Sequence, residues 1–323
     1  MNVLRIKGLR LWLPATRRPV LDGVDLTVGA GEIVALVGES GSGKSLTSRT
    51  ALGLLPAGAH TEGAVRVGDE DVLAMSPSRL RELRGRTVSM IFQDPRAATN
   101  PLRRIDDFLY EARPSSQPRA ASRARAHELL DAVGLDLRVL RRYPHELSGG
   151  MLQRVMIAAA LMGAPKLLLC DEPTTALDVT TQAEIIAVLD TLRRRYGTGL
   201  LFVTHDLELA AAIADRVYVM YAGRIAEGGP ARAVFSGPRH PYTTALLAST
   251  PRLEAPRTRL ASVPGQPPDL LTEPGGCAFA ARCPHATPVC GTDVPVPAAH
   301  DPDRIVACHH SALLPLQGGE TRG

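Results

Sequence analysis

The sequence has no long apolar run, no basic block and little lysine or cysteine. No stretch approaches the roughly 18 apolar residues of a membrane-spanning helix, so we predict no such span. The first residues, MNVLRIKGLRLWLP, carry charges throughout and lack the apolar core of a secretory signal, so we expect folding in the cytosol. The net charge is only +4, and the absence of a basic block argues against a nucleic-acid partner.

Of the 37 basic residues only Lys7, Lys44 and Lys166 are lysines, and Lys44 lies in GESGSGKS, residues 38–45. This stretch satisfies the pattern G-x-x-x-x-G-K-[ST] between a predicted strand, 33–37, and a predicted helix, 46–55. Glycines let backbone amides surround an anion, and the following helix directs its positive end at the same place. Lys44 supplies a point charge for the β- and γ-phosphates, and the Ser45 hydroxyl can bind Mg²⁺. The alternative is a glycine-rich turn that binds nothing, and we predict nucleotide binding.

Polar residues that follow predicted strands supply candidates for hydrolysis. The apolar residues 167–170 end in Asp171 and Glu172. There Asp171 can hold Mg²⁺ through water, and Glu172 can polarise the attacking water. Gln93 follows the predicted strand 88–92 and His205 follows 200–204. Because ligands lie off the carboxyl ends of parallel strands, Gln93 is a candidate Mg²⁺ and water ligand and His205 a γ-phosphate contact. A solvated acidic turn and a structural histidine are the alternatives.

The apolar pattern predicts an α/β fold with a parallel sheet. Strands and turns fill residues 1–95, and a hairpin is expected within 63–73. Residues 96–147 are rich in arginine and alanine with helical spacing, which predicts a helical insert. Strands and helices then alternate to a final hairpin around 222–223. Prolines crowd residues 251–302, which predicts loops held by something other than a hydrophobic core.

Residues 147–151, LSGGM, follow YPHE and precede QRV at 153–155. They resemble the signature motif of ABC transporters. GESGSGKS then resembles the Walker A loop, LLLCDEP the Walker B strand and Gln93 the Q-loop. Ala176-Leu177-Asp178 resembles the D-loop, and Thr204-His205-Asp206 the switch histidine. The resemblance covers residues 1–235. It implies a P-loop NTPase of the ABC type, with a parallel-sheet core, an antiparallel β subdomain and a helical subdomain at about 96–160. A Cys- and Pro-rich extension follows at 236–323.

The resemblance also implies an ATPase whose subunits stack head to tail with ATP between them. It assigns Glu172 and His205 to catalysis, and Ser45, Gln93 and Asp171 to Mg²⁺. Trp12 resembles the residue that stacks on adenine, with Leu11 or Leu13 as the alternative register. The remaining expected contacts to the chain's own ATP are Gly38, Glu39, Ser40, Gly41, Ser42, Gly43, Lys44, Ser45, Leu46 and Gln93. The expected contacts to the partner's ATP are Ser148, Gly149, Gly150 and Met151, with Asp178 in the D-loop.

Three phrases resemble the ATPases of peptide and nickel importers: IFQDP at 91–95, the methionine of LSGGM, and HPYT at 240–243. They imply an ATP-hydrolysing importer subunit at the cytoplasmic face of the inner membrane. Its implied partners are a second, different ATPase, two permease subunits and an extracytoplasmic binding protein. Leu152 and residues 96–99 differ from the residues that these importer ATPases usually have at those positions. Di- or oligopeptide, nickel and metallophore therefore all stay open as substrates. The alternatives are a soluble ABC ATPase that does not transport and an iron–sulfur-regulated sensor ATPase.

Four of the five cysteines, Cys277, Cys283, Cys290 and Cys308, lie near the end of the chain. Their gaps are longer than those of C-x₂₋₄-C zinc pairs, and a disulfide framework conflicts with the cytosol. Four thiolates can instead hold an iron–sulfur cluster. The segment resembles the tail of peptide-importer ATPases, some of which are reported to carry a [4Fe–4S] cluster. We therefore expect such a cluster in a structural role, with zinc or free thiols as the alternatives.

Overall fold

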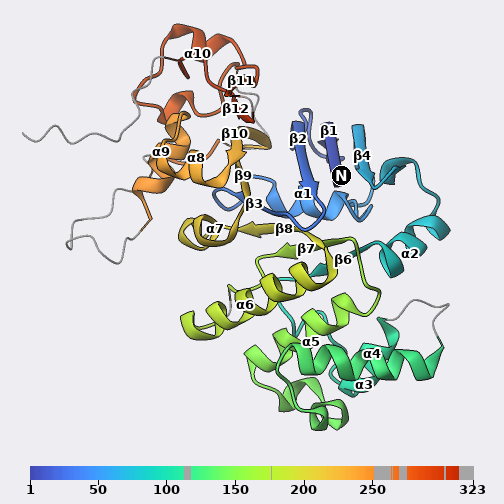
Figure 1. Ribbon diagram of the computed structural model, residues 1–323. Helices are drawn as coiled ribbons and strands as arrows, with labels where there is room; N and C mark the ends of the chain where they lie inside the picture. Colours follow the sequence, from blue (N-terminus) through green and yellow to red (C-terminus); the bar gives the residue numbers. More distant parts are fainter. Residues whose placement is uncertain are drawn as a thin grey trace, which may run out of the picture.

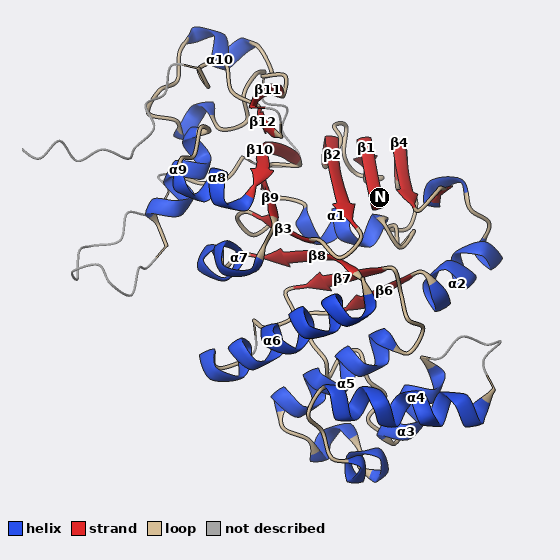
Figure 2. Ribbon diagram, viewed as in Figure 1, coloured by secondary structure: helices blue, strands red, loops and turns tan. Residues whose placement is uncertain are grey.

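The computed structural model describes residues 1–112, 118–175, 177–250, 263, 265–268, 275–301 and 303–312. Within these ranges the strands form two sheets that lie on one another, with helices around them (Figure 1, Figure 2). Ala176, which was expected in the D-loop, lies outside the described residues, as do parts of the proline-rich segment.

The smaller sheet is antiparallel and has the order β2-β1-β4-β5. Its strands are β2 (Leu21–Gly29), β1 (Asn2–Trp12), β4 (His60–Val67) and β5 (Glu70–Asp71), and the last two form the expected hairpin. Alternate residues of β2 are buried, as a half-buried strand requires. A short 3₁₀ helix, η1 (Val72–Ala74), and helix α2 (Pro77–Arg86) lead out of this sheet.

The larger sheet has the order β11-β12-β10-β9-β3-β8-β7-β6. Its central strands are parallel: β9 (Arg216–Tyr221), β3 (Ile33–Val37), β8 (Gly199–Thr204), β7 (Leu167–Asp171) and β6 (Val88–Ile91). Every residue of β3, β7 and β8 is buried because both faces are covered. One face packs on the antiparallel sheet, and the other packs on helices that include α6 (Val179–Tyr196) and α7 (Leu207–Ile213).

The helical insert lies beyond β6, at one end of the larger sheet (Figure 1). It contains α3 (Ile105–Glu111), α4 (Arg119–Ala132), the 3₁₀ turns η2 (Leu137–Arg141) and η3 (Pro144–Glu146), and α5 (Gly149–Leu161). Apolar residues at helical spacing, such as Ala126, Leu129, Leu130 and Val133, are fully buried. The predicted helical insert is therefore present.

The C-terminal extension lies at the opposite end of the larger sheet (Figure 1). After β10 (Arg224–Pro230) come α8 (Ala231–Ser236), α9 (Pro241–Ala248), η4 (Ala280–Arg282), α10 (Pro288–Thr292), β11 (Ala298–Asp301) and β12 (Arg304–Val306). Strand β12 pairs with β10, and Tyr242 and Phe279 are buried in the core. Within residues 251–302, where loops without an apolar core were expected, Phe279 is buried in this core, so the expectation is wrong there. The rings of Tyr242 and Phe279 pack on Tyr221 of β9 and on each other, with centroids 4.5–5.4 Å apart.

A buried ion pair fixes this extension. Glu227 of β10 is fully buried, and its carboxylate accepts hydrogen bonds from the Arg304 guanidinium and from the backbone N–H of His240.

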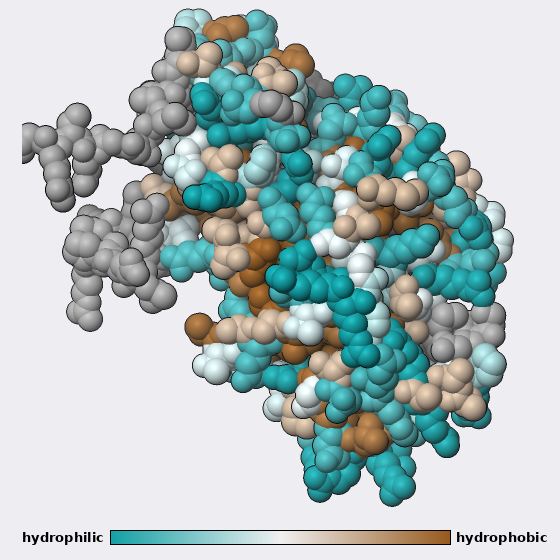
Figure 3. All heavy atoms as spheres, in the orientation of Figure 1, coloured by the Kyte–Doolittle hydropathy of each residue, from teal (hydrophilic) through white to brown (hydrophobic). Residues whose placement is uncertain are grey.

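Polar side chains cover much of the face shown in Figure 3, and apolar side chains reach it in separate patches. Among the described residues no helix has the length and apolar character needed to cross a membrane.

Candidate functional site

The loop between β3 and α1 (Lys44–Thr50) forms one wall of a pocket of about 670 Å³. Gly38 and Gly43 have φ values of +151° and +105°, which non-glycine residues rarely adopt. A Cβ at Gly38 would also lie 2.2 Å from the Met220 carbonyl oxygen. The pocket is lined by Leu13, Val20, Ser40, Gly41, Gly43, Lys44, Ser45, Leu46, Gln93, Glu172 and His205.

Lys44 is only 5% exposed, and its ammonium group stands beside this pocket. Its Nζ donates hydrogen bonds to the carbonyl oxygens of Gly38, at 2.8 Å, and Glu39, at 2.9 Å. Burial lowers the pKa of Lys44, while the nearby carboxylates of Glu172, Asp171 and Glu39 act in the opposite direction. A buried cation in this position is suited to attract a phosphate group.

Ser45 lines the pocket, and its hydroxyl contacts Asp171, which is not among the lining residues. The Ser45 Oγ donates a 2.6 Å hydrogen bond to Oδ1 of Asp171, which is 2% exposed. The other carboxylate oxygen, Oδ2, lies 3.4 Å from Nη2 of Arg49. A hydroxyl and a carboxylate are the kind of oxygen ligands that Mg²⁺ takes, together with water and phosphate. The donor set therefore fits the ion that the sequence predicts.

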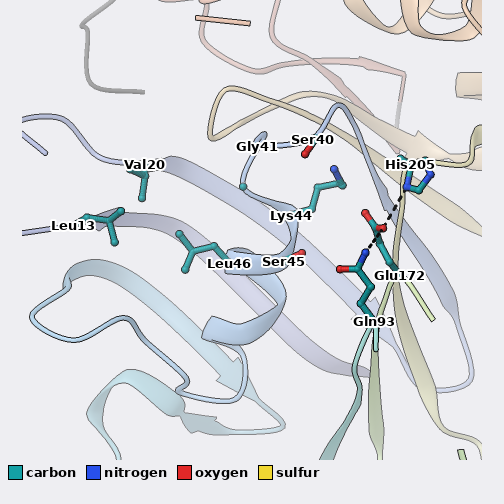
Figure 4. Close-up of a pocket in the computed structure, with 11 residues that line it drawn as sticks. Leu13, Val20, Ser40, Gly41, Lys44, Ser45, Leu46, Gln93, Glu172 and His205 are labelled. Atoms are coloured by element: carbon teal, nitrogen blue, oxygen red, sulfur yellow. Dashed lines mark hydrogen bonds and ion pairs between the residues drawn. The ribbon is translucent and has the colours of Figure 1, made fainter. Parts of the chain in front are cut away.

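Glu172 follows β7, and its carboxylate contacts side chains that follow the two neighbouring strands, β6 and β8 (Figure 4). Its Oε2 accepts hydrogen bonds from Gln93 Nε2 at 3.2 Å and from Thr175 Oγ1 at 3.0 Å, and lies 3.4 Å from His205 Nδ1. The structure thus brings together Gln93, Glu172 and His205. Thr175 was not predicted, although its place three residues after Glu172 in the same turn is a local signal.

The signature residues stand apart from this pocket. Ser148 caps helix α5 by accepting a hydrogen bond from the Met151 N–H at 3.3 Å. A Cβ at Gly150 would lie 2.7 Å from Cγ2 of Thr181, so α5 packs closely on α6. Asp178 caps α6, accepting from the Thr181 N–H at 3.0 Å. Residues 148–151 are not among those that line the chain's own pocket.

The adenine-stacking residue was predicted as Trp12, with Leu11 or Leu13 as the alternative. The Trp12 ring is half-buried and lies 5.4 Å from the His60 ring, centroid to centroid. Leu13 and Val20, rather than Trp12, are among the residues that line the pocket (Figure 4). Leu11 is fully buried in the core.

The four C-terminal cysteines line one small cavity of about 20 Å³, together with His285, His309 and His310. Burial raises the pKa values of the Cys277, Cys283 and Cys308 thiols. In the part of the chain that the structure describes, no group of three or more His, Cys, Asp or Glu side chains is placed to hold a metal ion. The structure therefore gathers the cysteines at one cavity without assembling a metal site.

The loop, the carboxylates and the capped signature helix define the class of protein, an ATPase of the ABC type. Two family models match the chain and agree with this class. The model described as ABC transporter matches residues 21–175, and the model described as oligopeptide/dipeptide transporter, C-terminal region, matches residues 226–290. The chain therefore belongs to the ATP-binding proteins of the oligopeptide/dipeptide ABC transporter family.

Two relatives illustrate the likeness. Over 294 residues the chain is 44% identical to the oligopeptide transport ATP-binding protein OppD of Salmonella typhimurium, covering 89% of this chain and 87% of that protein. Over 292 residues it is 43% identical to the dipeptide transport ATP-binding protein DppD of Bacillus subtilis, covering 88% and 87%.

Solved structures agree with the fold. CbiO1 from Clostridium perfringens, part of an ABC transporter complex, superposes with a TM-score of 0.64 at 26% identity, over 72% of this chain and 90% of that one. A dimeric ATP-binding cassette with bound ADP and phosphate gives a TM-score of 0.61 at 27% identity, over 71% and 99%. The predicted family, the α/β fold of an ABC-type ATPase and the ATPase activity are confirmed, whereas the Cys-rich extension in the predicted fold class is not.

Proposed function

We propose that the chain is the ATP-hydrolysing subunit of an ABC importer that takes up di- or oligopeptides. The observation that carries this proposal is the likeness to relatives named for oligopeptide and dipeptide transport, which extends through both the ATPase region and the C-terminal region. We further propose an ATPase domain at 1–235, with a helical subdomain at about 96–160, and an extension at 236–323.

In this proposal the triphosphate lies against the amides of residues 38–46, and Lys44 contacts the β- and γ-phosphates. Ser45, Gln93 and Asp171 would hold Mg²⁺, which neutralises phosphate charge when it is bound. Glu172 accepts a proton from the attacking water, and His205 holds the γ-phosphate in line. His205 Nδ1 lies 3.4 Å from Glu172 Oε2, which supports the proposal that both residues act at the γ-phosphate. Trp12 is the proposed adenine contact, and Leu13, which lines the pocket, is the alternative.

The site is completed by a second ATPase in this proposal. Residues 148–151 do not line the chain's own pocket, which supports their use on the partner's ATP. The dimeric cassette with bound ADP and phosphate offers a precedent for two stacked copies. We propose a different chain as the second ATPase, with two permease subunits and an extracytoplasmic binding protein, at the cytoplasmic face of the inner membrane.

Transport can be tested in a peptide-dependent auxotroph of the source organism that lacks this chain. Expression of the parent chain should restore growth on di- or oligopeptides, and Lys44→Ala at equal abundance should not. Restored nickel uptake without restored peptide use would assign the metal as substrate instead. Normal peptide-dependent growth without the chain would contradict the proposal.

We also propose that Cys277, Cys283, Cys290 and Cys308 hold a [4Fe–4S] cluster that stabilises the extension. Their position around one cavity supports this proposal. Anaerobic purification followed by absorption spectra and iron and zinc analysis provides the test. Iron and sulfide at about four atoms each per chain are expected. A zinc-loaded protein, or a colourless one free of both metals, would contradict the cluster.

A further inference from the structure

The C-terminal extension reaches back to the phosphate-binding loop through one arginine. Arg282 closes η4, and its guanidinium makes a two-pronged contact with the carboxylate of Glu39 in that loop: Nη1 to Oε2 at 2.7 Å and Nη2 to Oε1 at 2.9 Å. These residues are 243 positions apart in the sequence. The Arg282 side chain is 4% exposed and that of Glu39 is 21% exposed, so solvent screens the pair only partly.

Arg282 is itself held in place by the extension and by β9. Its Nη1 also donates to Tyr221 Oη at 3.1 Å, and its Nη2 donates to the Val263 carbonyl at 3.3 Å. The guanidinium carbon lies 5.7 Å from the centroid of the Tyr221 ring and 5.8 Å from that of Phe279. Since the guanidinium is fixed on several sides, it sets the position of Glu39 rather than following it.

Glu39 receives a second contact from the same extension, because its backbone N–H donates to Tyr242 Oη at 2.9 Å. Tyr242 is fully buried. The carbonyl of Glu39 in turn accepts a hydrogen bond from Lys44 Nζ. A series of direct contacts therefore connects the extension, through Glu39, to the Lys44 ammonium, which we propose contacts the phosphates.

We propose that Arg282 is a positioning residue for ATP binding, which neutralises and anchors Glu39 so that the loop accepts a polyphosphate. This inference rests on the proposed nucleotide site and deepens it. Glu39 places a negative charge next to Ser40 and Gly41, which line the pocket. Without Arg282 that charge faces the incoming phosphates unpaired, and repulsion between like charges weakens binding. The extension thereby controls nucleotide affinity.

The test compares MgADP affinity of full-length variants by titration calorimetry, with the KM for ATP and kcat measured in parallel. Arg282→Gln should raise the MgADP Kd and the KM for ATP on the order of tenfold, with kcat changed much less. Arg282→Lys keeps the positive charge but cannot make the two-pronged contact with Glu39, so its MgADP Kd should lie between those of the parent and Arg282→Gln. Adding Glu39→Gln to Arg282→Gln removes the unpaired carboxylate and should return the Kd most of the way to the parent value.

A matched control is Arg216→Gln. Arg216 also joins the extension to the body, through the Asp303 carbonyl at 3.1 Å and Glu32 at 3.3 Å, but at the end of β3 away from the loop. Its MgADP Kd should equal that of the parent. Parent-like Kd values in Arg282→Gln, or a double variant no better than Arg282→Gln, would overturn the inference while leaving the proposed function intact. A parent chain that failed to bind MgADP would instead defeat the proposed function.

Discussion

At the scale of single residues, Glu172 combines an unusual backbone with a precise set of neighbours. Its φ is +48°, and its N–H donates to the Val203 carbonyl at 2.9 Å. Non-glycine residues seldom adopt this conformation, and it persists where the surroundings enforce it. Here it turns the carboxylate toward Gln93 and His205.

Glu172→Gln should therefore keep nucleotide binding and lose turnover. The amide preserves the shape of the side chain but cannot accept the proton of water, so we expect kcat to fall by about 10²–10⁴-fold. The ATP Kd should stay within a few-fold of the parent value. Single-turnover hydrolysis and nucleotide titration measure the two quantities. Near-parent hydrolysis in this variant would remove Glu172 from the role of base.

The sequence supplies candidate residues for the chemistry, but it does not predict which contacts hold each one in place. Lys44, Ser45 and Asp171 follow from local patterns, and the structure brings them together. The left-handed backbone of Glu172 depends on β8, and Arg282 depends on a fold that joins distant segments. No local pattern contains either partner, so these features could not be predicted.

At the scale of elements, helix α9 begins at a buried histidine. His240 is 4% exposed, and its Nδ1 accepts a hydrogen bond from the Tyr242 N–H at 3.0 Å. Burial lowers the pKa of His240 from 6.5 to about 4, although Glu227 acts in the opposite direction. The unfolded chain therefore binds a proton at a higher pH than the folded chain, so stability is lost as the pH falls from 6.5 towards 4.

His240→Asn tests this linkage, because asparagine can still cap the helix but does not titrate. Between about pH 7.5 and about pH 5, the parent should lose about 2 kcal/mol more of its free energy of unfolding than the variant. Urea unfolding at the two pH values measures the difference. Equal losses in parent and variant would show that His240 does not drive the pH dependence.

The sequence predicts the helices and strands whose apolar residues recur at regular spacing. The buried strands β3, β6, β7 and β8 and the helical insert stand where apolar spacing indicates them. Helix α6 begins at Val179, where Asp178 caps it, six residues before Ile185, the first of its buried apolar residues. Strand β12 was missed because three residues carry no readable alternation, and only pairing with β10 makes them a strand.

At the scale of the whole molecule, the proposed function requires two ATPases, because it assigns the signature residues to the partner's nucleotide. Ser148→Arg should leave the MgATP Kd of the isolated chain unchanged. It should abolish most ATP turnover of the assembled pair, because the bulky cation fills the place of the partner's phosphate. Ser148→Thr keeps the helix cap and serves as the control. Weakened ATP binding by the isolated Ser148→Arg chain would place the signature at its own site.

The central claim is that the loop at residues 38–45 and the ammonium of Lys44 bind the triphosphate of ATP. The most direct measurement is the MgATP affinity and turnover of purified Lys44→Ala beside the parent. Losing a charge-assisted contact in a buried site should weaken binding by more than about tenfold and reduce turnover to background. A Lys44→Ala protein that binds and cleaves ATP as the parent does would contradict the claim.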